Sequence, residues 1–480
     1  MLITSGAERA IYAPADGTVV GSIREATLDD ITHAVAAARR SLDDWRRAAP
    51  YDRAAVLSRA AALLENRAEE LGLLHARESG KVITQARKEI FGAAALLDEN
   101  AHIGRFDAGY LAPTGALPGG ERDLTLVERV PLGVVACVIP FNFPVELTIE
   151  KAGAALAAGN TVVVKPPPQN PLATIATVQA LIDAGLPEGV LTVLPGGREV
   201  SAALCAAPGV DAVSLTGSVG AGVAVAQATA HMLRPLHLEL GGNGAAVVFD
   251  DADVDLVVSE TLRGRMLMNG QACAATKRLV VHRSVVTEVV ERLEAVLAAI
   301  TVGDPTDESS EVGPLIDARS ASRVAAQVSK AVSQGATLVR GEMSARDAWY
   351  PPALLRSVPA GADVAVDDEI FGPVVTTIPF DTDEESIEIV NSSQLALTAA
   401  IFSGDLERAL AAAQRFEVGG VVVNGTNNYR PPVVPFGGVG LAGTGREGIG
   451  YTYEDLTRTR FIAVRGVRPP GVPLGGSADG

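Results

Sequence analysis

The chain has 480 residues, 48% of them hydrophobic, and a formal net charge of -17 at pH 7. This length exceeds what one hydrophobic core usually serves, so we expect two or three domains. The acidic balance argues against a nucleic-acid partner, because binding to phosphate backbones needs clustered Lys and Arg.

The distribution of apolar, cysteine and histidine residues excludes further classes. Apolar stretches are interrupted well before the length of about 18 residues that spans a membrane, and residues 1–8 lack the pattern of a secretion signal. We therefore expect no membrane partner and a cytoplasmic location. Cys137, Cys205 and Cys273 are too few and too scattered for a disulfide framework, and no His pair has metal-ligand spacing, so we expect no metal.

The N-terminal part of the chain has helical patterns. Thr27, followed by Asp29 and Asp30, predicts the start of a helix whose Ala-rich pattern runs through Trp45. A second helix is predicted from about Asp52 to His75.

Strand and helix patterns alternate from residue 133 onwards. Four apolar runs predict buried strands at residues 133–139, 161–164, 191–194 and 212–215. A helix is predicted between Asn170 and Gly185, and this alternation is typical of a parallel sheet with helices on both faces. A second alternation, with strands near 245–249 and 279–281, places a domain boundary near residues 240–242. The Gly- and Pro-rich end of the chain predicts a disordered tail.

Cys273 is the first candidate for chemistry. It lies among small residues and follows Gly270 and Gln271, which permit the close approach of a ligand. A thiol is a strong nucleophile even when little of it is ionised, so a modest fall in its pKa would activate it. The alternative is a buried structural cysteine, which is the commoner state of a lone Cys.

Glu239 and Asn142 are the second and third candidates. Glu239 ends an apolar strand just before Gly241 and Gly242, where a carboxylate can act as a general base for water. Asn142, between Phe141 and Phe143 after a buried strand, has an amide that can stabilise an oxyanion. The alternatives are a solvated or ion-paired glutamate and an Asx turn.

A glycine turn after the strand at 212–215 leads into a helix start. Gly217, Ser218 and Gly222 belong to this segment, and exposed N–H groups at such a helix N-terminus favour anionic groups. A literal GxGxxG occurs at Gly438, Gly440 and Gly443, but it does not open a βαβ unit, and we interpret it as a glycine-rich loop.

Together these segments resemble the aldehyde dehydrogenase superfamily from about Pro14 to Val464. The motifs that carry the resemblance occur in the family's order: residues 140–144, Lys165-Pro166, Thr216-Gly217-Ser218, Glu239-Leu240-Gly241-Gly242, Gly270-Gln271-Ala272-Cys273, residues 369–373, and residues 435–438 with Gly445-Arg446-Glu447.

The resemblance implies an α/β fold with three parts. These are a Rossmann-like cofactor domain at 1–111 and 131–240, an α/β catalytic domain at 241–455, and a small β oligomerisation arm at 112–130 and 456–466. Residues 467–480 would form the disordered tail. A homodimer or homotetramer is implied, without a choice between the two.

The resemblance also implies residue roles. Cys273 would attack an aldehyde, Asn142 would hold the oxyanion, and Glu239 would activate the water that hydrolyses the thioester to an acid. Retention of Glu239 favours hydrolysis over transfer to coenzyme A. The cofactor-binding residues would be Lys165 and Pro166 at the adenosine ribose, Gly217, Ser218 and Gly222 near the pyrophosphate, and Glu369 and Phe371 at the nicotinamide.

Two departures from the family pattern lead to specific expectations. Pro168 stands where members that prefer NAD usually carry a glutamate, so we expect NADP to be accepted alongside or ahead of NAD. Glu146 and Glu150, four residues apart, are expected on one helix face beside Phe143 in the substrate pocket, where they would disfavour anionic aldehydes. Alternatively, both glutamates are solvated or paired with Lys151 or Arg265.

Two functions other than aldehyde oxidation remain open at this point. A thiol esterase or hydrolase could use Cys273 and Glu239 without redox chemistry, although no histidine base lies near either residue in the sequence. A catalytically silent scaffold would keep the fold and the cofactor site. Reduction of the nicotinamide in the presence of an aldehyde distinguishes the first function from the other two.

Overall fold

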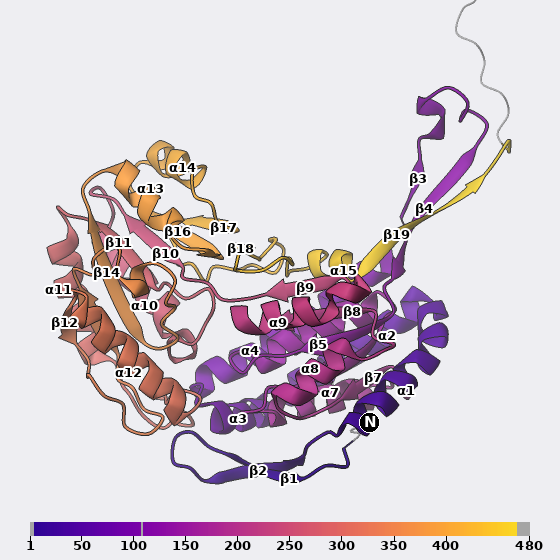
Figure 1. The fold of residues 1–480 in the computed structure, drawn as a ribbon, viewed down its shortest axis with the longest axis horizontal. Coiled ribbons are helices and arrows are strands. Elements are labelled where there is room, and N and C mark those ends of the chain that lie inside the picture. The colour runs from indigo at the N-terminus through magenta and orange to yellow at the C-terminus, as the bar shows by residue number, and fades with distance from the viewer. Residues whose placement is uncertain (1–3, 107–108, 468–480) are drawn as a thin grey trace, which may run out of the picture.

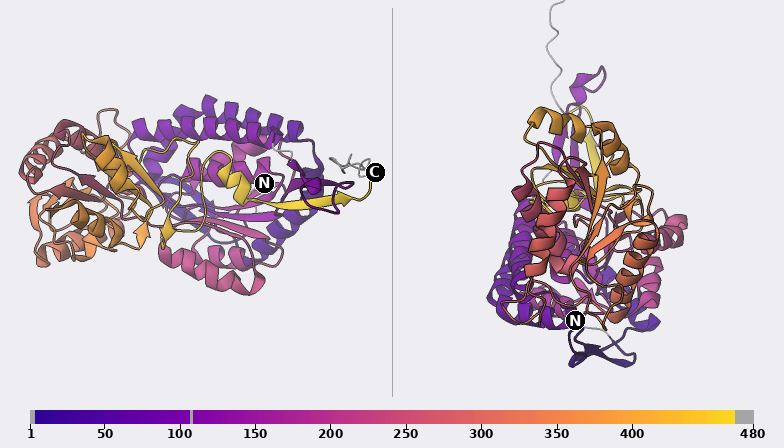
Figure 2. Two further views of the ribbon diagram at one scale, coloured as in Figure 1. Left: turned by 90° about the horizontal axis from the view of Figure 1, so that it is seen from above. Right: turned by 90° about the vertical axis from the view of Figure 1, so that its left-hand side faces the viewer.

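The computed structural model describes residues 4–106 and 109–467, which form two α/β bodies and a projecting three-stranded arm (Figures 1 and 2). The predicted tail from 468 onwards lies outside the described residues. Among the described residues, no helix has the length and apolarity needed to cross a bilayer.

The first body contains a five-stranded parallel sheet. Its strands in spatial order are β7 (Leu191–Val193), β6 (Thr161–Lys165), β5 (Val134–Val138), β8 (Ala212–Thr216) and β9 (Leu236–Glu239). Four of these strands are the apolar runs that the sequence predicts. Their side chains are buried on both faces, as expected of a parallel sheet covered on both sides.

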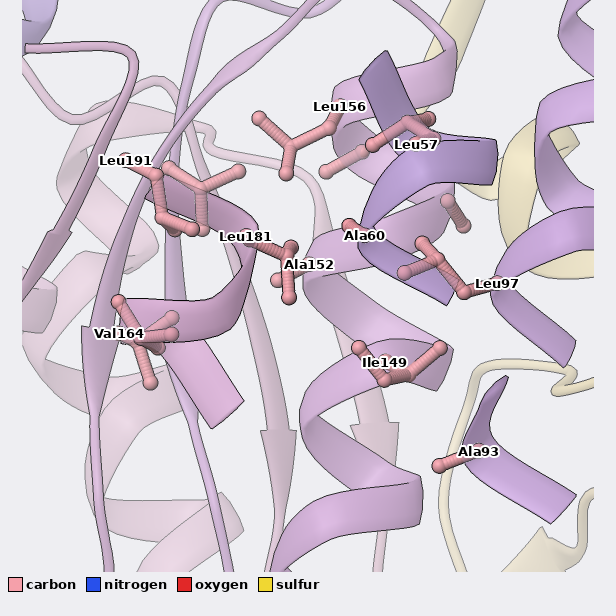
Figure 3. Packing of buried hydrophobic residues seen from close by; sticks show 14 of the residues in the cluster. Leu57, Ala60, Ala93, Leu97, Ile149, Ala152, Leu156, Val164, Leu181 and Leu191 are labelled. Atoms are coloured by element: carbon pink, nitrogen blue, oxygen red, sulfur yellow. The ribbon is translucent and has the colours of Figure 1, made fainter. Parts of the chain in front are cut away.

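Helices cover both faces of this sheet. One face packs against α2 (Pro50–Asn66), α3 (Ala68–Ser79), α4 (Ile83–Phe106), α5 (Pro144–Thr148), α6 (Ala154–Ala157) and α7 (Leu172–Asp183). The other face packs against α1 (Leu28–Arg47), α8 (Arg198–Ala206) and α9 (Val219–Thr229). Figure 3 shows Leu57, Leu97 and Leu156 in the first of these cores. Truncating such a buried leucine to alanine typically costs about 2–5 kcal/mol.

The helix starts and ends follow local signals, with one correction. Thr27 caps α1 as predicted: its hydroxyl accepts from Asp30 N, and the Asp30 carboxylate accepts from Thr27 N. The single helix predicted from Asp52 to His75 is wrong. The chain breaks at Arg67 between α2 and α3, where the Arg67 N–H closes the last turn of α2 and the acidic first turn of α3 begins a new helix.

The second body contains a seven-stranded sheet. Its strands in order are β12 (Thr337–Arg340), β13 (Ala353–Arg356), β14 (Val374–Phe380), β11 (Arg278–His282), β10 (Ala245–Val248), β16 (Thr398–Phe402) and β17 (Gly420–Val423). All neighbours are parallel except β12 and β13. Its helices are α10 (Val254–Met266), α11 (Val286–Ala299), α12 (Ala318–Ser333), α13 (Asp383–Asn391) and α14 (Leu406–Ala413).

The projecting arm is an antiparallel sheet of β3 (Tyr110–Ala112), β4 (Leu124–Pro131) and β19 (Thr457–Val464) (Figure 1). It therefore begins two residues before the predicted boundary at 112, because Tyr110 already pairs with Val127.

Three further segments connect the two bodies. The hairpin of β1 (Glu8–Tyr12) and β2 (Val19–Arg24) lies along the first body, and its turn reaches the second, where Trp349 Nε1 donates to Ala15 O at 3.1 Å. Beyond β17 the chain returns toward the first body through β18 (Val439–Gly440), which pairs with β15 (Leu395–Ala396). It then forms α15 (Tyr451–Asp455), whose Tyr453 joins the core of the first body. This last segment falls inside the stretch predicted as catalytic domain.

Candidate active site

Cys273 lies in a loop whose backbone conformation is held by hydrogen bonds from neighbouring segments. Met268 and Asn269 just before it have φ of 52° and 56°, a left-handed conformation that costs free energy in non-glycine residues. The Asn269 side chain holds this turn by donating to Gly80 O and Pro314 O, both at 2.8 Å, and by accepting from Gly313 N. Cys137 and Cys205 are buried, whereas Cys273 is partly exposed, so the structural alternative describes the first two better.

A lysine that the sequence analysis missed supports the same loop. Lys277 Nζ donates to Ala272 O at 2.8 Å and to Cys273 O at 2.5 Å, and it pairs with Glu369 at 2.8 Å. Burial raises the pKa of the Cys273 thiol to about 11, while the charge of Lys277 opposes that rise. The thiol is therefore protonated at neutral pH in this structure, and attack on a carbonyl requires its proton to be removed.

Glu239 ends β9 in an unusual electrostatic state. The residue is 3% exposed, and neither carboxylate oxygen has a hydrogen-bond partner among the described residues. Burial raises the pKa of Glu239 well above its usual value, and the negative charge of Glu447 adds to the rise. Burial without a partner therefore disfavours the charged form of this carboxyl group.

A fully paired charge network lies beside Glu239. Glu447 accepts from Lys151 at 2.8 Å and from Arg430 at 2.9 Å, and Arg430 also contacts Glu150 at 3.4 Å. Although burial acts in the opposite direction, Lys151 and Arg430 lower the pKa of Glu447 to about 2. The sequence motif around Glu447 was noted in advance, but nothing in the local sequence pointed to Arg430.

Asn142 follows β5 with its amide available. Its Oδ1 accepts from Phe143 N at 3.1 Å, and its Nδ2 donates to none of the described residues. Because the acceptor bonds the next residue and not the one after it, the Asx-turn alternative does not apply. The amide N–H therefore remains free to serve an oxyanion.

A buried triad anchors the helix that follows Asn142. Glu89 Oε1 accepts from Val145 N at 3.0 Å and from Glu146 N at 3.2 Å, while its Oε2 contacts Lys81 and His75. Despite the opposing effect of burial, Lys81 and His75 lower the pKa of Glu89 to about 2. These three residues, from α3, α4 and the loop between them, were not predicted.

Two glycines bring the candidate segments into contact. A Cβ atom on Gly242 would lie 2.8 Å from Cys273 O, and one on Gly241 would lie 2.7 Å from Glu369 Oε2. The peptide after Glu239 thus runs directly against the loops of Cys273 and Glu369. The segment of Asn142 joins them because the rings of Phe141 and Phe371 meet edge to face, 5.8 Å apart.

The two glutamates predicted in the substrate pocket differ in burial and in partners, although Arg430 interacts electrostatically with both. A π-helical turn over Ile149–Gly153 follows α5 directly and contains Glu150. Glu150 is buried and accepts from Gly448 N and the Thr452 hydroxyl as well as from Arg430, so it does not line a pocket as predicted.

Glu146 remains partly exposed, and its carboxylate pairs with no described residue. Burial raises the pKa of Glu146 to about 7. Phe143 lies under the Lys81 ammonium, 3.8 Å from the ring centre. The predicted alternative partner Arg265 is elsewhere, bound to Val374 O and Ile370 O, and Lys151 pairs with Glu447.

The predicted cofactor residues other than Glu369 and Phe371 follow the carboxyl ends of β6 and β8 in the first body. Lys165 ends β6 before Pro166 and is 4% exposed, yet its Nζ has no hydrogen-bond partner among the described residues. Ser218 caps α9 by accepting from Ala221 N, and a Cβ on Gly220 would meet open space. These features fit an anionic dinucleotide at a helix N-terminus. Gly222 instead packs against Leu240, which a Cβ would approach to 2.7 Å.

The comparisons with known proteins give the same class as this geometry. The model of the aldehyde dehydrogenase family matches residues 3–462. The chain is 37% identical over 444 residues to 3-sulfolactaldehyde dehydrogenase of Priestia aryabhattai, covering 92% of each protein.

Among solved structures, NADP-dependent glyceraldehyde-3-phosphate dehydrogenase from Bacillus halodurans C-125, complexed with NADP, aligns with a TM-score of 0.92 at 34% identity over 96% of each chain. NAD-dependent aldehyde dehydrogenase from Sinorhizobium meliloti aligns with a TM-score of 0.93 at 32% identity over 98% of this chain and 94% of its own.

The chain therefore belongs to the aldehyde dehydrogenase family. The predicted α/β fold class is confirmed, as are the enzyme class, an NAD(P)-dependent aldehyde dehydrogenase, and the choice of NAD or NADP as cofactor.

Proposed function

We propose that the protein oxidises an aldehyde to a free carboxylic acid through a covalent intermediate on Cys273. The Cys273 sulfur adds to the carbonyl carbon as its proton departs to water or a nearby base. The resulting oxyanion accepts hydrogen bonds from Asn142 Nδ2 and the Cys273 backbone N–H. A nicotinamide bound in the first body supplies the acceptor for the hydride that leaves this carbon.

Loss of the hydride leaves a thioester on Cys273, and Glu239 completes the cycle. Its carboxylate takes a proton from a water molecule, the oxygen of that water attacks the thioester carbon, and the sulfur departs as the acid is released. The observation that carries the proposal is the pairing of a partly exposed thiol with a buried carboxylate that has no partner, on segments that meet at Gly242. Because Glu239 is present, hydrolysis is favoured over transfer to coenzyme A.

The cofactor site is assigned to residues of the first body and to two residues of the second. Lys165 and Pro166 serve the adenosine ribose, and Gly217 and Ser218 serve the pyrophosphate at the start of α9. Glu369 and Phe371 face the nicotinamide portion from the loop before β14. Gly222 serves the site by letting α9 pack closely on Leu240.

The arm is assigned to assembly with other copies of the chain. Its strands expose a band of large apolar side chains that a monomer would leave in water. They are Tyr110, Leu111, Leu126, Phe461, Ile462 and Val464. A homodimer or homotetramer formed through this sheet is the proposed state. We keep the division into a cofactor domain at 1–111 and 131–240 and a catalytic domain at 241–455, except that residues 110–111 and 131 belong to strands of the arm and Tyr453 of α15 packs in the first body.

The substrate pocket is assigned to Phe143 and Glu146. Glu150 is paired to Arg430, whereas the Glu146 carboxyl group pairs with no described residue, so the pocket would carry less negative charge than the sequence suggested. Neutral aldehydes are therefore the expected starting point for a substrate search.

The test is a panel of neutral, anionic and amino-substituted aldehydes, each assayed with NAD and with NADP for formation of reduced nicotinamide and of free acid. Cys273→Ala serves as the control. Reduced cofactor with stoichiometric acid, abolished in the variant, supports the proposal. Acid release from an ester without cofactor would favour the thiol hydrolase, and turnover that survives in Cys273→Ala would refute the covalent route.

A further inference from the structure

The inner face of the N-terminal hairpin carries a charge pair that the aldehyde chemistry does not use. Arg9 of β1 pairs in register with Ile23 of β2, and side chains opposite each other in a sheet lie on the same face. Ile23 is 5% exposed, so this face is turned toward the protein. Glu25, two residues beyond Ile23, lies on the same side and binds Arg9 Nε at 2.7 Å.

This face meets the first body at the end of β6, where Lys165 lies. The strands β6 and β7 pair Val164 with Val193, so Lys165 is level with Leu194, and Leu194 N donates to Val164 O at 2.8 Å. The next residue, Pro195, accepts from Ala26 N at 2.7 Å. Glu25 is therefore one residue from the hydrogen bond that attaches the hairpin beside Lys165.

The electrostatics agree with this placement. Burial, together with the positive charge of Arg9, lowers the pKa of Lys165 to about 8, while Cys205 and the negative charge of Glu25 act in the opposite direction. Arg9 Nη2 is buried and has no hydrogen-bond partner among the described residues. Two cationic groups with unused donors and one carboxylate thus surround the place proposed for the adenosine ribose.

We propose that Arg9 and Glu25 form a cofactor-selecting pair at the ribose 2' position, where Arg9 binds the 2'-phosphate of NADP and at the same time withholds Glu25 from the ribose hydroxyls. Pro168 removes the acceptor that the loop would otherwise offer a 2'-hydroxyl, which leaves Glu25 as a carboxylate beside Lys165. A guanidinium binds phosphate with charge-assisted hydrogen bonds. The inference rests on the proposed role of Lys165.

The experiment measures binding without catalysis, so its outcome does not depend on the aldehyde chemistry. Adenosine 2',5'-bisphosphate and adenosine 5'-monophosphate are titrated calorimetrically into the full-length protein, and NADP and NAD are titrated in parallel. In Arg9→Gln, affinity for the two 2'-phosphorylated ligands is expected to fall about tenfold, while affinity for the other two is kept or rises. In Glu25→Gln, the preference is expected to shift the other way, toward the 2'-phosphorylated ligands.

A matched control lies on the same hairpin. Arg24 is next to Glu25 but on the outer face, where it is exposed, so Arg24→Gln removes the same charge without facing Lys165. It is expected to leave the ratio of the two affinities within about twofold of the parent. Arg9→Lys should retain part of the preference.

Two results would overturn the inference. One is an Arg9→Gln protein whose affinity ratio equals that of Arg24→Gln. The other is a loss of affinity for all four ligands in equal proportion, which would mean that the hairpin supports the fold and does not select the cofactor. If the ligands bind as expected but no aldehyde is oxidised, the failure lies with the proposed function and not with this pair.

Discussion

Glu239 and Glu447 are buried glutamates in the same region, but they differ in their hydrogen-bond partners and in the direction of their pKa shifts. Glu447 accepts from Lys151 and Arg430 and has its pKa lowered to about 2, whereas Glu239 has no partner for either oxygen and has its pKa raised. Burying a carboxylate costs several kcal/mol unless it is paired. The difference shows that the Glu447 carboxylate is paired with cations, whereas the Glu239 carboxyl group is left without compensation.

The largest expected effect comes from removing the thiol that we propose as the nucleophile. Cys273→Ala should lower kcat for aldehyde oxidation by about a thousandfold or more, because no thiohemiacetal can form. Cofactor affinity measured by calorimetry should stay unchanged, since Cys273 is not among the proposed cofactor contacts. An equal loss of cofactor binding would instead indicate a collapsed site.

Replacing Glu239, the unpaired acid, should separate formation of the thioester from its hydrolysis. Glu239→Gln should reduce steady-state turnover by about a hundredfold or more, yet release one burst of reduced nicotinamide per active site, because the thioester forms and then persists. Rapid-mixing absorbance and mass spectrometry of the acyl-enzyme provide the measurement. Absence of both the burst and the adduct would mean that Glu239 acts before the hydride leaves.

The stability of Glu239→Gln relative to the parent protein should increase as the pH rises. The pKa of Glu239 is raised in the folded state, so above its usual value the unfolded chain ionises first and stability falls with rising pH through the folded pKa. Glutamine has no proton to lose, so thermal unfolding should occur at a higher Tm than in the parent near neutral and alkaline pH. The two Tm values should converge in acid, and a constant difference at all pH values would contradict this linkage.

Replacing Glu447, the paired acid, should lower the stability of the protein and shift the pH dependence of the reaction. Glu447→Gln leaves Lys151 and Arg430 without their main counter-ion, so the free energy of unfolding should fall by about 3–5 kcal/mol. Because the charge of Glu447 raises the pKa of Glu239, the pH profile of thioester hydrolysis should move to lower pH. An unshifted profile in the folded variant would show that the two acids are not coupled.

A more moderate effect is expected at the anchor of α5. Glu89→Gln keeps an acceptor for Val145 N and Glu146 N but loses the charge that holds Lys81, so kcat should fall by about tenfold through a misplaced Asn142 amide. Cofactor affinity should be unaffected. Glu78→Gln is a suitable control, because Glu78 caps α7 through Leu172 N and Ala173 N and does not contact α5.

The smallest effect should come from an exposed ion pair. Arg283 binds Asp381 through two nitrogens at 2.7 and 2.9 Å, but both side chains are more than half exposed. Arg283→Ala should therefore leave both the free energy of unfolding and kcat/KM nearly unchanged. Chemical denaturation measures the first and the aldehyde assay the second, and a larger loss would mean that this pair does more than a surface contact.

The sequence predicted those strands and helix ends whose formation is determined by residues close together in the chain. Apolar runs gave four of the five strands of the first sheet, and Thr27 with its acidic first turn gave the start of α1. It did not predict the break at Arg67, because the helical pattern continues across it. It also did not predict that Glu150 is buried, because its partners Arg430, Gly448 and Thr452 come from a distant part of the chain.

The partners of the site residues were beyond the reach of sequence patterns. Glu150 and Arg430 are 280 positions apart, and Glu89 reaches Val145 across 56 positions. Such pairs are set by tertiary packing, which no local period or spacing records. By contrast, Cys273 was singled out from the small residues next to it in the sequence, and it is the cysteine that the structure leaves partly exposed, while its role as a nucleophile stays a prediction.

The return of the chain from β17 to α15 has a consequence for any attempt to divide the protein. A piece ending at Val423 would contain every strand of both large sheets, yet it would lack Arg430, Glu447 and the aromatic ring of Tyr453. Lys151 would then be buried in an apolar interior without its ion-pair partner Glu447. The segment after β17 thus links the two bodies. Neither body can be exchanged between relatives as an independent module unless this segment is exchanged with it.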